Sequence, residues 1–326
     1  MSAATAVSLQ ESASFVIEAE AEGKASGQEL LSWFGSKFDH VRSLASRHGS
    51  VLFRGFDLSC RTSFHDFATA ATEPLDYALG NSPRSRLTKA VYTSTEFPAE
   101  YTISFHNELS YCAGWPEFLM FFCTLPAESG GETPLVDSHA LWRSLPGRLK
   151  QRFEEKGLIY IRNLHGGSGL GPSWKQSFGT TSKQAVEARC TAGDVHFAWQ
   201  SDGGLRLWEK RPATRQHPLS GETVWFNQAD QFHPTNHPAD VCQSLAEYYR
   251  GKETRMPHYC LFGDGSPLEE GELDTIRERA ANLATAFGWR RGDLLLVDNM
   301  KAAHGRNPYR GAREILVSMF RWRNGI

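Results

Sequence analysis

Short apolar segments rich in β-branched and aromatic residues recur along this chain at irregular intervals, and they restrict the folds that it can adopt. The clearest are Ser50–Phe56, Phe118–Leu125, Leu158–Ile161, Thr223–Phe226, Asp293–Asp298 and Glu314–Phe320. Each has the length and composition of a strand. Helical patterns separate some of them, but no regular strand–helix–strand alternation appears, which disfavours a doubly wound parallel sheet. The pattern predicts a fold of the α+β class, mainly β, built as a β-sandwich or jelly roll with flanking and inserted helices.

The beginning of the chain predicts a helix, a strand and a second helix. Apolar residues recur three or four apart over residues 29–47, and Gly49 follows as a helix stop. Ser63 is expected to cap the second helix. Further helices are expected at Ala140–Glu155, Ala239–Tyr249 and Glu272–Phe287. The stretch 101–111 is expected to be extended and to end before a turn at 114–116.

No segment is composed like an interdomain linker. The Gly- and Ser-rich stretch 165–181 is expected to be a long loop. We therefore expect one domain over residues 1–326, with a helix–strand part at about 1–80 and a jelly-roll core with helical insertions at about 81–326.

Charge and cysteine content exclude several classes of protein. With 35 Lys+Arg against 37 Asp+Glu, the chain shows no basic footprint for nucleic acid or an anionic membrane surface. No apolar run approaches the roughly 18 residues of a spanning helix, and the N-terminus lacks the pattern of a signal peptide, so a cytoplasmic location is expected. The six cysteines are scattered without metal-site spacing. They are expected to be small buried hydrophobes instead of zinc ligands or disulfides.

One histidine, His106, has a carboxylate two positions later, Glu108. In an extended strand these residues project from the same face, so an imidazole and a carboxylate can converge on one ion. A third ligand must come from elsewhere. His304 is the best candidate, because it lies in a polar turn after the strong strand 293–298. Two histidines and one carboxylate form the facial triad of non-haem Fe(II) oxygenases, which leaves three coordination positions open.

An arginine and a threonine accompany this set. Arg313 lies nine residues after His304 at the start of an apolar strand, and its fork of donors suits a carboxylate. Thr133 follows a glycine pair at 130–131 and offers a hydroxyl to the same group. A dicarboxylate cosubstrate fits this arrangement.

The segments FHNE, GGETP, HGR and GAREILVSM occur in this order, with Thr133 27 residues after His106. This set resembles the taurine dioxygenase superfamily of Fe(II)- and 2-oxoglutarate-dependent oxygenases, most of all its clavaminate-synthase-like members. The resemblance implies a double-stranded β-helix (jelly roll), with Fe(II) held by His106, Glu108 and His304. It also implies 2-oxoglutarate held by Arg313 and Thr133, with O2 as the second cosubstrate. Arg310 and Arg321 remain alternatives to Arg313.

The resemblance further implies hydroxylation of an unactivated C–H bond in an amino acid or amino-acid-derived metabolite, free or bound to a carrier protein. Desaturation or ring formation would use the same residues, while the presence of Glu108 disfavours halogenation. Candidate substrate contacts are Tyr92, Asn107, Asn227, Arg306 and Arg321. A homo-oligomer is compatible with the sequence. A hydrolase lacks support because no GxSxG elbow occurs, and the intact triad argues against a non-catalytic binding module.

Overall fold

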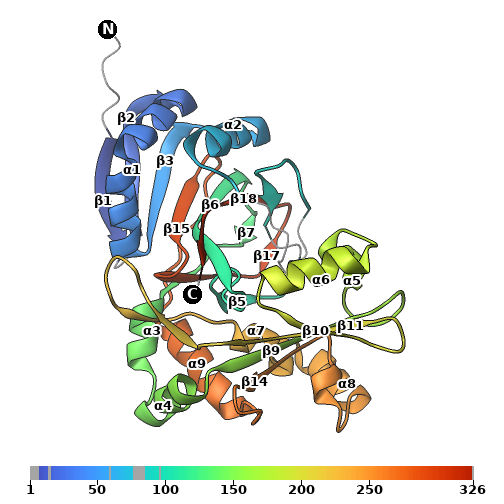
Figure 1. Ribbon diagram of the computed structural model, residues 1–326. Helices are drawn as coiled ribbons and strands as arrows, with labels where there is room; N and C mark the ends of the chain where they lie inside the picture. The colour runs from blue at the N-terminus through green and yellow to red at the C-terminus, as the bar shows by residue number, and fades with distance from the viewer. Residues whose placement is uncertain (1–6, 14–15, 59, 76–84, 95–96, 325–326) are drawn as a thin grey trace.

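The computed structural model describes residues 7–13, 16–58, 60–75, 85–94 and 97–324. The largest sheet has seven strands in the order β1-β2-β3-β15-β6-β18-β4 (Figure 1). These strands are β1 (Val7–Ala13), β2 (Val16–Ser26), β3 (Ser50–Asp57), β15 (Leu294–Asp298), β6 (Gly114–Leu125), β18 (Glu314–Asn324) and β4 (Tyr92–Thr93). Neighbouring strands are antiparallel except for β2 and β3.

A smaller antiparallel sheet faces the large one and has the order β5-β16-β8. Its strands are β5 (Ile103–His106), β16 (Ala302–Arg306) and β8 (Leu135–Asp137). Leu295 and Val297 on β15 share one hydrophobic cluster with Leu135 and Ala302 on the smaller sheet. Two antiparallel sheets packed over a common core are the jelly-roll arrangement, so the expected fold class is confirmed.

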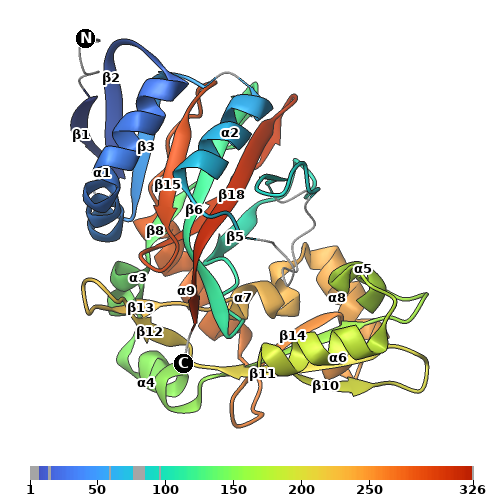
Figure 2. The ribbon, with the colours of Figure 1, turned by 45° about the horizontal axis from the view of Figure 1, so that its top comes forward.

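The other face of the large sheet is covered by α1 (Gly27–His48) and α2 (Arg61–Ala71) (Figure 2). Leu294 and Leu296 point to this side, where they share a cluster with residues of both helices. Because successive strand residues alternate between faces, the four apolar residues Leu294–Val297 of β15 can serve both cores.

The predicted first helix is confirmed. It begins with a capping box between Ser26 and Glu29 and ends at His48, and the C-cap residue Gly49 has a φ of 84°, which suits glycine. The predicted cap of the second helix is wrong, because α2 begins at Arg61 with Cys60 as its N-cap residue. The Ser63 hydroxyl instead accepts a hydrogen bond from the Cys60 N–H at 3.1 Å.

The remaining elements pack beside the smaller sheet (Figure 2). A four-stranded antiparallel sheet has the order β10 (His196–Trp199), β11 (Leu205–Arg211), β9 (Leu158–Leu164) and β14 (His258–Phe262). Two strand pairs are β12 (Thr214–Gln216) with β13 (Thr223–Trp225), and β7 (Ser129–Gly130) with β17 (Tyr309–Arg310). The helices are α3 (Ser138–Ser144), α4 (Gly147–Lys156), α5 (Trp174–Phe178), α6 (Lys183–Ala192), α7 (Ala229–Phe232), α8 (Ala239–Tyr248), α9 (Glu270–Leu283) and the 3₁₀ turns Pro234–Asn236 and Glu253–Arg255.

Several expected boundaries are wrong for local reasons. The helix expected over 140–155 is two helices, α3 and α4, because Pro146 between them lacks an N–H and fixes its own φ. The last helix, α9, ends at Leu283, and Thr285 then exchanges backbone hydrogen bonds with Leu135. The long loop expected at 165–181 contains α5.

The turn expected at 114–116 is also wrong, because β6 runs through it. Pro116 pairs with β18, and on the other side β15 has already ended at Asp298, opposite Phe118. A proline is tolerated where no strand lies on its N–H side.

All six cysteines are free, and four of them are buried as expected: Cys112, Cys123, Cys190 and Cys260. Burial raises the pKa of the Cys190 thiol to about 11, which keeps it protonated and inert near neutral pH. Among the described residues, no helix combines the length and apolar character that crossing a membrane requires. The single-domain organisation stays a prediction.

Phe122 ties α2 to the large sheet. Its ring is fully buried and stacks on Phe64 of α2 with centroids 5.0 Å apart. We expect Phe122→Ala to lower the free energy of unfolding by about 3–5 kcal/mol, because the substitution leaves a cavity that the helix and sheet only partly close. Chemical denaturation measures the change. Tyr248→Ala, at a side chain that is 76% exposed, is the control and should change stability little; equal losses would contradict the proposed packing.

Candidate active site

The two histidines of the predicted triad lie on neighbouring strands. His304 of β16 is the direct antiparallel partner of His106 at the end of β5. Opposed side chains in such a pair lie close together on one face, and the two imidazole centroids are 4.2 Å apart. His304 was expected in a polar turn; it lies on a strand instead.

A β-bulge in β5 adjusts the register beside this pair. His304 faces His106 and Arg306 faces Ile103, so three steps on β5 match two on β16. Bulges of this kind redirect side chains and are frequent next to active sites.

Glu108 does not lie on the strand that carries His106. The extended conformation expected over 101–111 is confirmed only for β5; it is wrong beyond His106, where the strand ends and Glu108 begins a turn. The next residue, Leu109, has a φ of 56°, in the left-handed region that disfavours a residue with a side chain. His106 and Glu108 therefore do not meet as neighbours on one face of a strand, as expected from their spacing.

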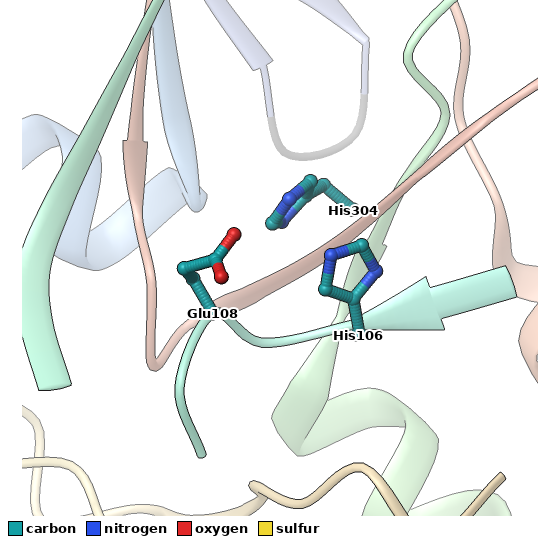
Figure 3. Close-up of side chains that lie close together, drawn as sticks. All are labelled: His106, Glu108 and His304. Carbon is teal, nitrogen blue, oxygen red and sulfur yellow. The ribbon is translucent and has the colours of Figure 1, made fainter. Parts of the chain in front are cut away.

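His106, Glu108 and His304 nevertheless converge (Figure 3). Each offers one ligand atom, and these atoms all lie within 4.8 Å of one another. All three residues are buried. Nδ1 of His106 lies 3.0 Å from the carbonyl oxygen of Ser104, which can only accept. Nδ1 therefore carries the hydrogen and Nε2 keeps a lone pair, which is the state that a metal-binding imidazole needs. This donor set fits a divalent iron ion.

The two histidines line a cavity together with the predicted cosubstrate residues Thr133 and Arg313. The other lining residues are Ser94, Ile103, Phe121, Gly305, Arg306 and Ile315. The lining of the cavity thus combines the two imidazoles, two arginines and several apolar side chains. Such a cavity suits a small dicarboxylate that reaches from a metal to an arginine.

Arg313 lies directly before β18 and is mostly buried. Burial, together with the nearby charge of Arg306, lowers its pKa to about 10. Arg313 is still cationic at neutral pH, so an anion in the cavity would relieve this unfavourable burial of positive charge.

A glycine turn shapes the site around Arg313. Gly131 has a φ of 73°, and its carbonyl accepts a hydrogen bond from Nε of Arg313 at 2.9 Å. A Cβ at Gly131 would lie 2.9 Å from Cδ of Arg313, and one at Gly130 would collide with the carbonyl oxygen of Pro308. Gly131 is thus required for the close approach of Arg313, and Gly130 for the close approach of the Pro308 carbonyl.

Thr133 faces the same cavity and is buried. Its hydroxyl oxygen accepts a hydrogen bond from Nε1 of Trp289 at 3.2 Å, so the hydroxyl hydrogen remains available to a ligand. Trp289 was not anticipated from the sequence.

Among the residues predicted to touch substrate, Arg306 lines this cavity. Its guanidinium also donates to the backbone carbonyls of Phe97, Pro98 and Tyr101 at 2.6–2.7 Å, so it holds the segment 97–101 against β16. Tyr92 is buried on β4 in the cluster between the two sheets and is not among the lining residues.

Asn107 and Asn227 line a second cavity, which is bounded by residues of β5, β13 and α9. Ala303 lines this second cavity whereas His304, the next residue, lines the first, so the two cavities lie on opposite faces of the smaller sheet. The Asn227 side chain donates to the Ala213 carbonyl at 2.8 Å and accepts from the Ala229 N–H. Both of its polar ends are used inside the protein.

Arg321 lies elsewhere. Its guanidinium pairs with Glu117 at 3.2 Å and lies over the ring of Phe38 in α1, on the helix side of the large sheet. It lines neither of the two cavities beside β5.

Asn299 was missed in the sequence. It follows β15, and its side chain forms hydrogen bonds with both backbone groups of Glu108. The only signal was a polar Asp298–Asn299 pair directly after a fully apolar strand, a pattern that also fits an ordinary strand end.

Comparison with known proteins agrees with this geometry. The family model "Taurine catabolism dioxygenase TauD, TfdA family" matches residues 9–320. The dapdiamide synthesis protein DdaC of Enterobacter agglomerans is 34% identical over 285 residues, which are 86% of this chain and 85% of that protein. A clavaminate synthase-like protein of Arabidopsis thaliana is 31% identical over 292 residues, 86% of this chain and 84% of that protein.

Solved structures share the fold at low identity. PvcB, described as an Fe, α-ketoglutarate dependent oxygenase from an isonitrile synthetic pathway, matches with a TM-score of 0.57 and 15% identity, covering 100% of this chain and 96% of its own. A taurine dioxygenase from Burkholderia xenovorans matches with a TM-score of 0.53 and 15% identity, covering 96% and 89%. The family resemblance drawn from the sequence is confirmed. The chain belongs to the TauD/TfdA family and is an oxygenase that uses Fe(II), 2-oxoglutarate and O2.

Proposed function

We propose that this oxygenase hydroxylates an unactivated C–H bond of an amino acid or an amino-acid-derived metabolite, with formation of succinate and CO2. The observation that carries the proposal is the single cavity in which His106 and His304 meet Thr133 and Arg313, with Glu108 beside them.

His106, Glu108 and His304 would hold Fe(II) through two imidazoles and one carboxylate. Three protein ligands leave three coordination positions for the cosubstrate and O2. When bound, the metal and 2-oxoglutarate supply oxidative power through decarboxylation of the cosubstrate.

Arg313 and Thr133 would hold the distal carboxylate of 2-oxoglutarate. The guanidinium contributes charge and directed donors, and the Thr133 hydroxyl adds one more hydrogen bond. Because Gly131 and Trp289 already hold these two groups, little side-chain freedom is lost on binding.

The walls between the two ends are apolar. Ile103, Phe121 and Ile315 line the cavity, and the Phe121 ring lies 5.2 Å from that of His304. These side chains keep water from the reacting atoms and strengthen every polar contact inside the site.

An amino-acid-related substrate is supported by the relatives. DdaC is named for dapdiamide synthesis, and PvcB is described as part of an isonitrile synthetic pathway. A free metabolite and one attached to a carrier protein use the same metal site. Desaturation or ring formation is the second candidate, because it would need the same residues. Glu108 completes the ligand set, so chloride has no vacated protein-ligand position to occupy, and we do not propose halogenation.

The first experiment is an anaerobic titration of the Fe(II)-loaded protein with 2-oxoglutarate, followed by the visible charge-transfer absorption of the chelate. We expect the band in the native protein and its loss in His106→Ala, because one metal ligand is gone. His40→Ala is the control, since His40 is exposed on α1, and it should keep the band. A native protein that binds iron but shows no band at saturating 2-oxoglutarate would overturn the assignment of the cavity.

A second prediction concerns the glycine turn. Gly131→Ala should weaken 2-oxoglutarate binding by about tenfold, because a Cβ at this position would lie 2.9 Å from Cδ of Arg313 and displace the guanidinium from the carboxylate. The 2-oxoglutarate dissociation constant from the same titration measures the effect. Gly35→Ala is the matched control, since no atom lies within 4 Å of its added Cβ. If Gly131→Ala binds 2-oxoglutarate as tightly as the native protein, the proposal that Arg313 holds the cosubstrate is contradicted.

A further inference from the structure

Glu108 precedes a residue with a strained backbone. It is 2% exposed and lies in the turn that follows β5, and the adjacent Leu109 is held at a φ of 56° while being 3% exposed. A left-handed conformation costs such a residue about 1–2 kcal/mol and persists only where surrounding contacts impose it. The chain must therefore contain groups that hold this turn.

The Asn299 side chain provides those contacts. Its Oδ1 accepts a hydrogen bond from the Glu108 N–H at 2.7 Å, and its Nδ2 donates to the Glu108 carbonyl at 2.9 Å. Nδ2 also donates to the Pro116 carbonyl at 3.0 Å. One amide thus pairs with both backbone groups of Glu108, as a neighbouring strand would.

Asn299 is itself held from several sides. It is fully buried, its N–H donates to the Glu117 carbonyl at 2.9 Å, and its carbonyl accepts from Nδ2 of Asn107 at 2.7 Å. The hydrogen bonds between Asn299 and residues 107–108 therefore run in both directions. Asn107 was predicted as a substrate contact. Its side-chain amide instead donates hydrogen bonds to the Asn299 carbonyl and to the Ser138 hydroxyl.

The residue before Asn299, Asp298, connects Asn299 to the rest of the fold through hydrogen bonds. Oδ2 of Asp298 accepts from the Ser46 hydroxyl of α1 at 2.7 Å and lies 3.1 Å from Nε2 of His217. Its Oδ1 accepts from the N–H groups of Met300 and Lys301 at 3.0 Å. The backbone next to Asn299 is thus held by side-chain contacts to α1 and to the segment between β12 and β13.

We infer that Asn299 is a positioning residue that sets the place of the Glu108 carboxylate relative to His106 and His304. This inference rests on the proposed role of Glu108 as a metal ligand. A glutamate side chain has three rotatable bonds, so its carboxylate is placed only if its backbone is rigid. The histidines obtain that rigidity from strand pairing, whereas Glu108 obtains it from the side chain of Asn299.

The test is a double-mutant cycle in which Mn(II) replaces Fe(II), because Mn(II) does not oxidise in air and free Mn(II) is measured by electron paramagnetic resonance. We expect Asn299→Ala to weaken Mn(II) binding by about 10- to 100-fold, the range for groups that orient metal ligands. In a Glu108→Ala background the same substitution should change affinity by less than about twofold, the scatter for sites that do not interact.

Asn163→Ala is the matched control. Asn163 also uses its side-chain amide to bridge two backbone carbonyls, those of Thr254 and Met256, but it lies on β9 outside the site. Its loss should lower the thermal midpoint of the metal-free protein without weakening Mn(II) binding. If Asn299→Ala does not fold, Asn299→Asp takes its place in the cycle, since it keeps the acceptor for the Glu108 N–H and removes both donors.

Two results would overturn the inference. Equal weakening with and without Glu108 would show that Asn299 acts on the histidines or on the fold. Unchanged Mn(II) affinity in Asn299→Ala would show that Glu108 is placed without it. A different failure is separable: if Glu108→Ala alone binds Mn(II) as tightly as the native protein, Glu108 is not a ligand and the proposed function itself must be revised.

Discussion

The antiparallel pairing of β5 with β16 is the constraint on which the site depends. It places His304 directly opposite His106, with ring centroids 4.2 Å apart, although the two residues are far apart in sequence. The pairing holds because Leu135 and Ala302 of the smaller sheet pack on the apolar inner face of β15. The metal-binding geometry is thus a consequence of how two sheets share one core.

Different interactions act on the two groups of residues around the cavity: hydrogen bonds on the triad, and buried positive charge at Arg313. At one end, backbone pairing and buried hydrogen bonds fix the positions of His106, Glu108 and His304, the three proposed metal ligands. At the other end, positive charge is held in a partly buried place: burial and the neighbouring Arg306 lower the pKa of Arg313 to about 10. A carboxylate bound at this place would offset that unfavourable energy, which is why we propose that Arg313 holds the distal carboxylate of 2-oxoglutarate.

Sequence reasoning succeeded where a single local pattern decides the outcome. The amphipathic repeat and Gly49 predicted α1, and the apolar run 293–298 predicted β15. It failed where non-local contacts decide. Pro116 lies within β6 because the neighbouring strand β15 ends before it. Glu108 lies outside the strand of His106, and the Asn299 side chain forms the backbone hydrogen bonds that a neighbouring strand would have formed. Neither effect is encoded in spacing.

By itself the sequence determined the residue types of the site and the family, because the order and spacing of the His, Glu, Thr and Arg motifs are specific to this chemistry. It also determined the α+β fold class through its pattern of short apolar strands. Only the tertiary structure decided which residues meet. It pairs the strand of His304 with that of His106, and it directs the Arg306 guanidinium to three backbone carbonyls. It also pairs Arg321 with Glu117 and joins the Asn107 side chain to the Asn299 carbonyl by a hydrogen bond. The physical reason is that strand register and buried hydrogen bonds join segments distant in sequence, and the energy of those contacts depends on both partners.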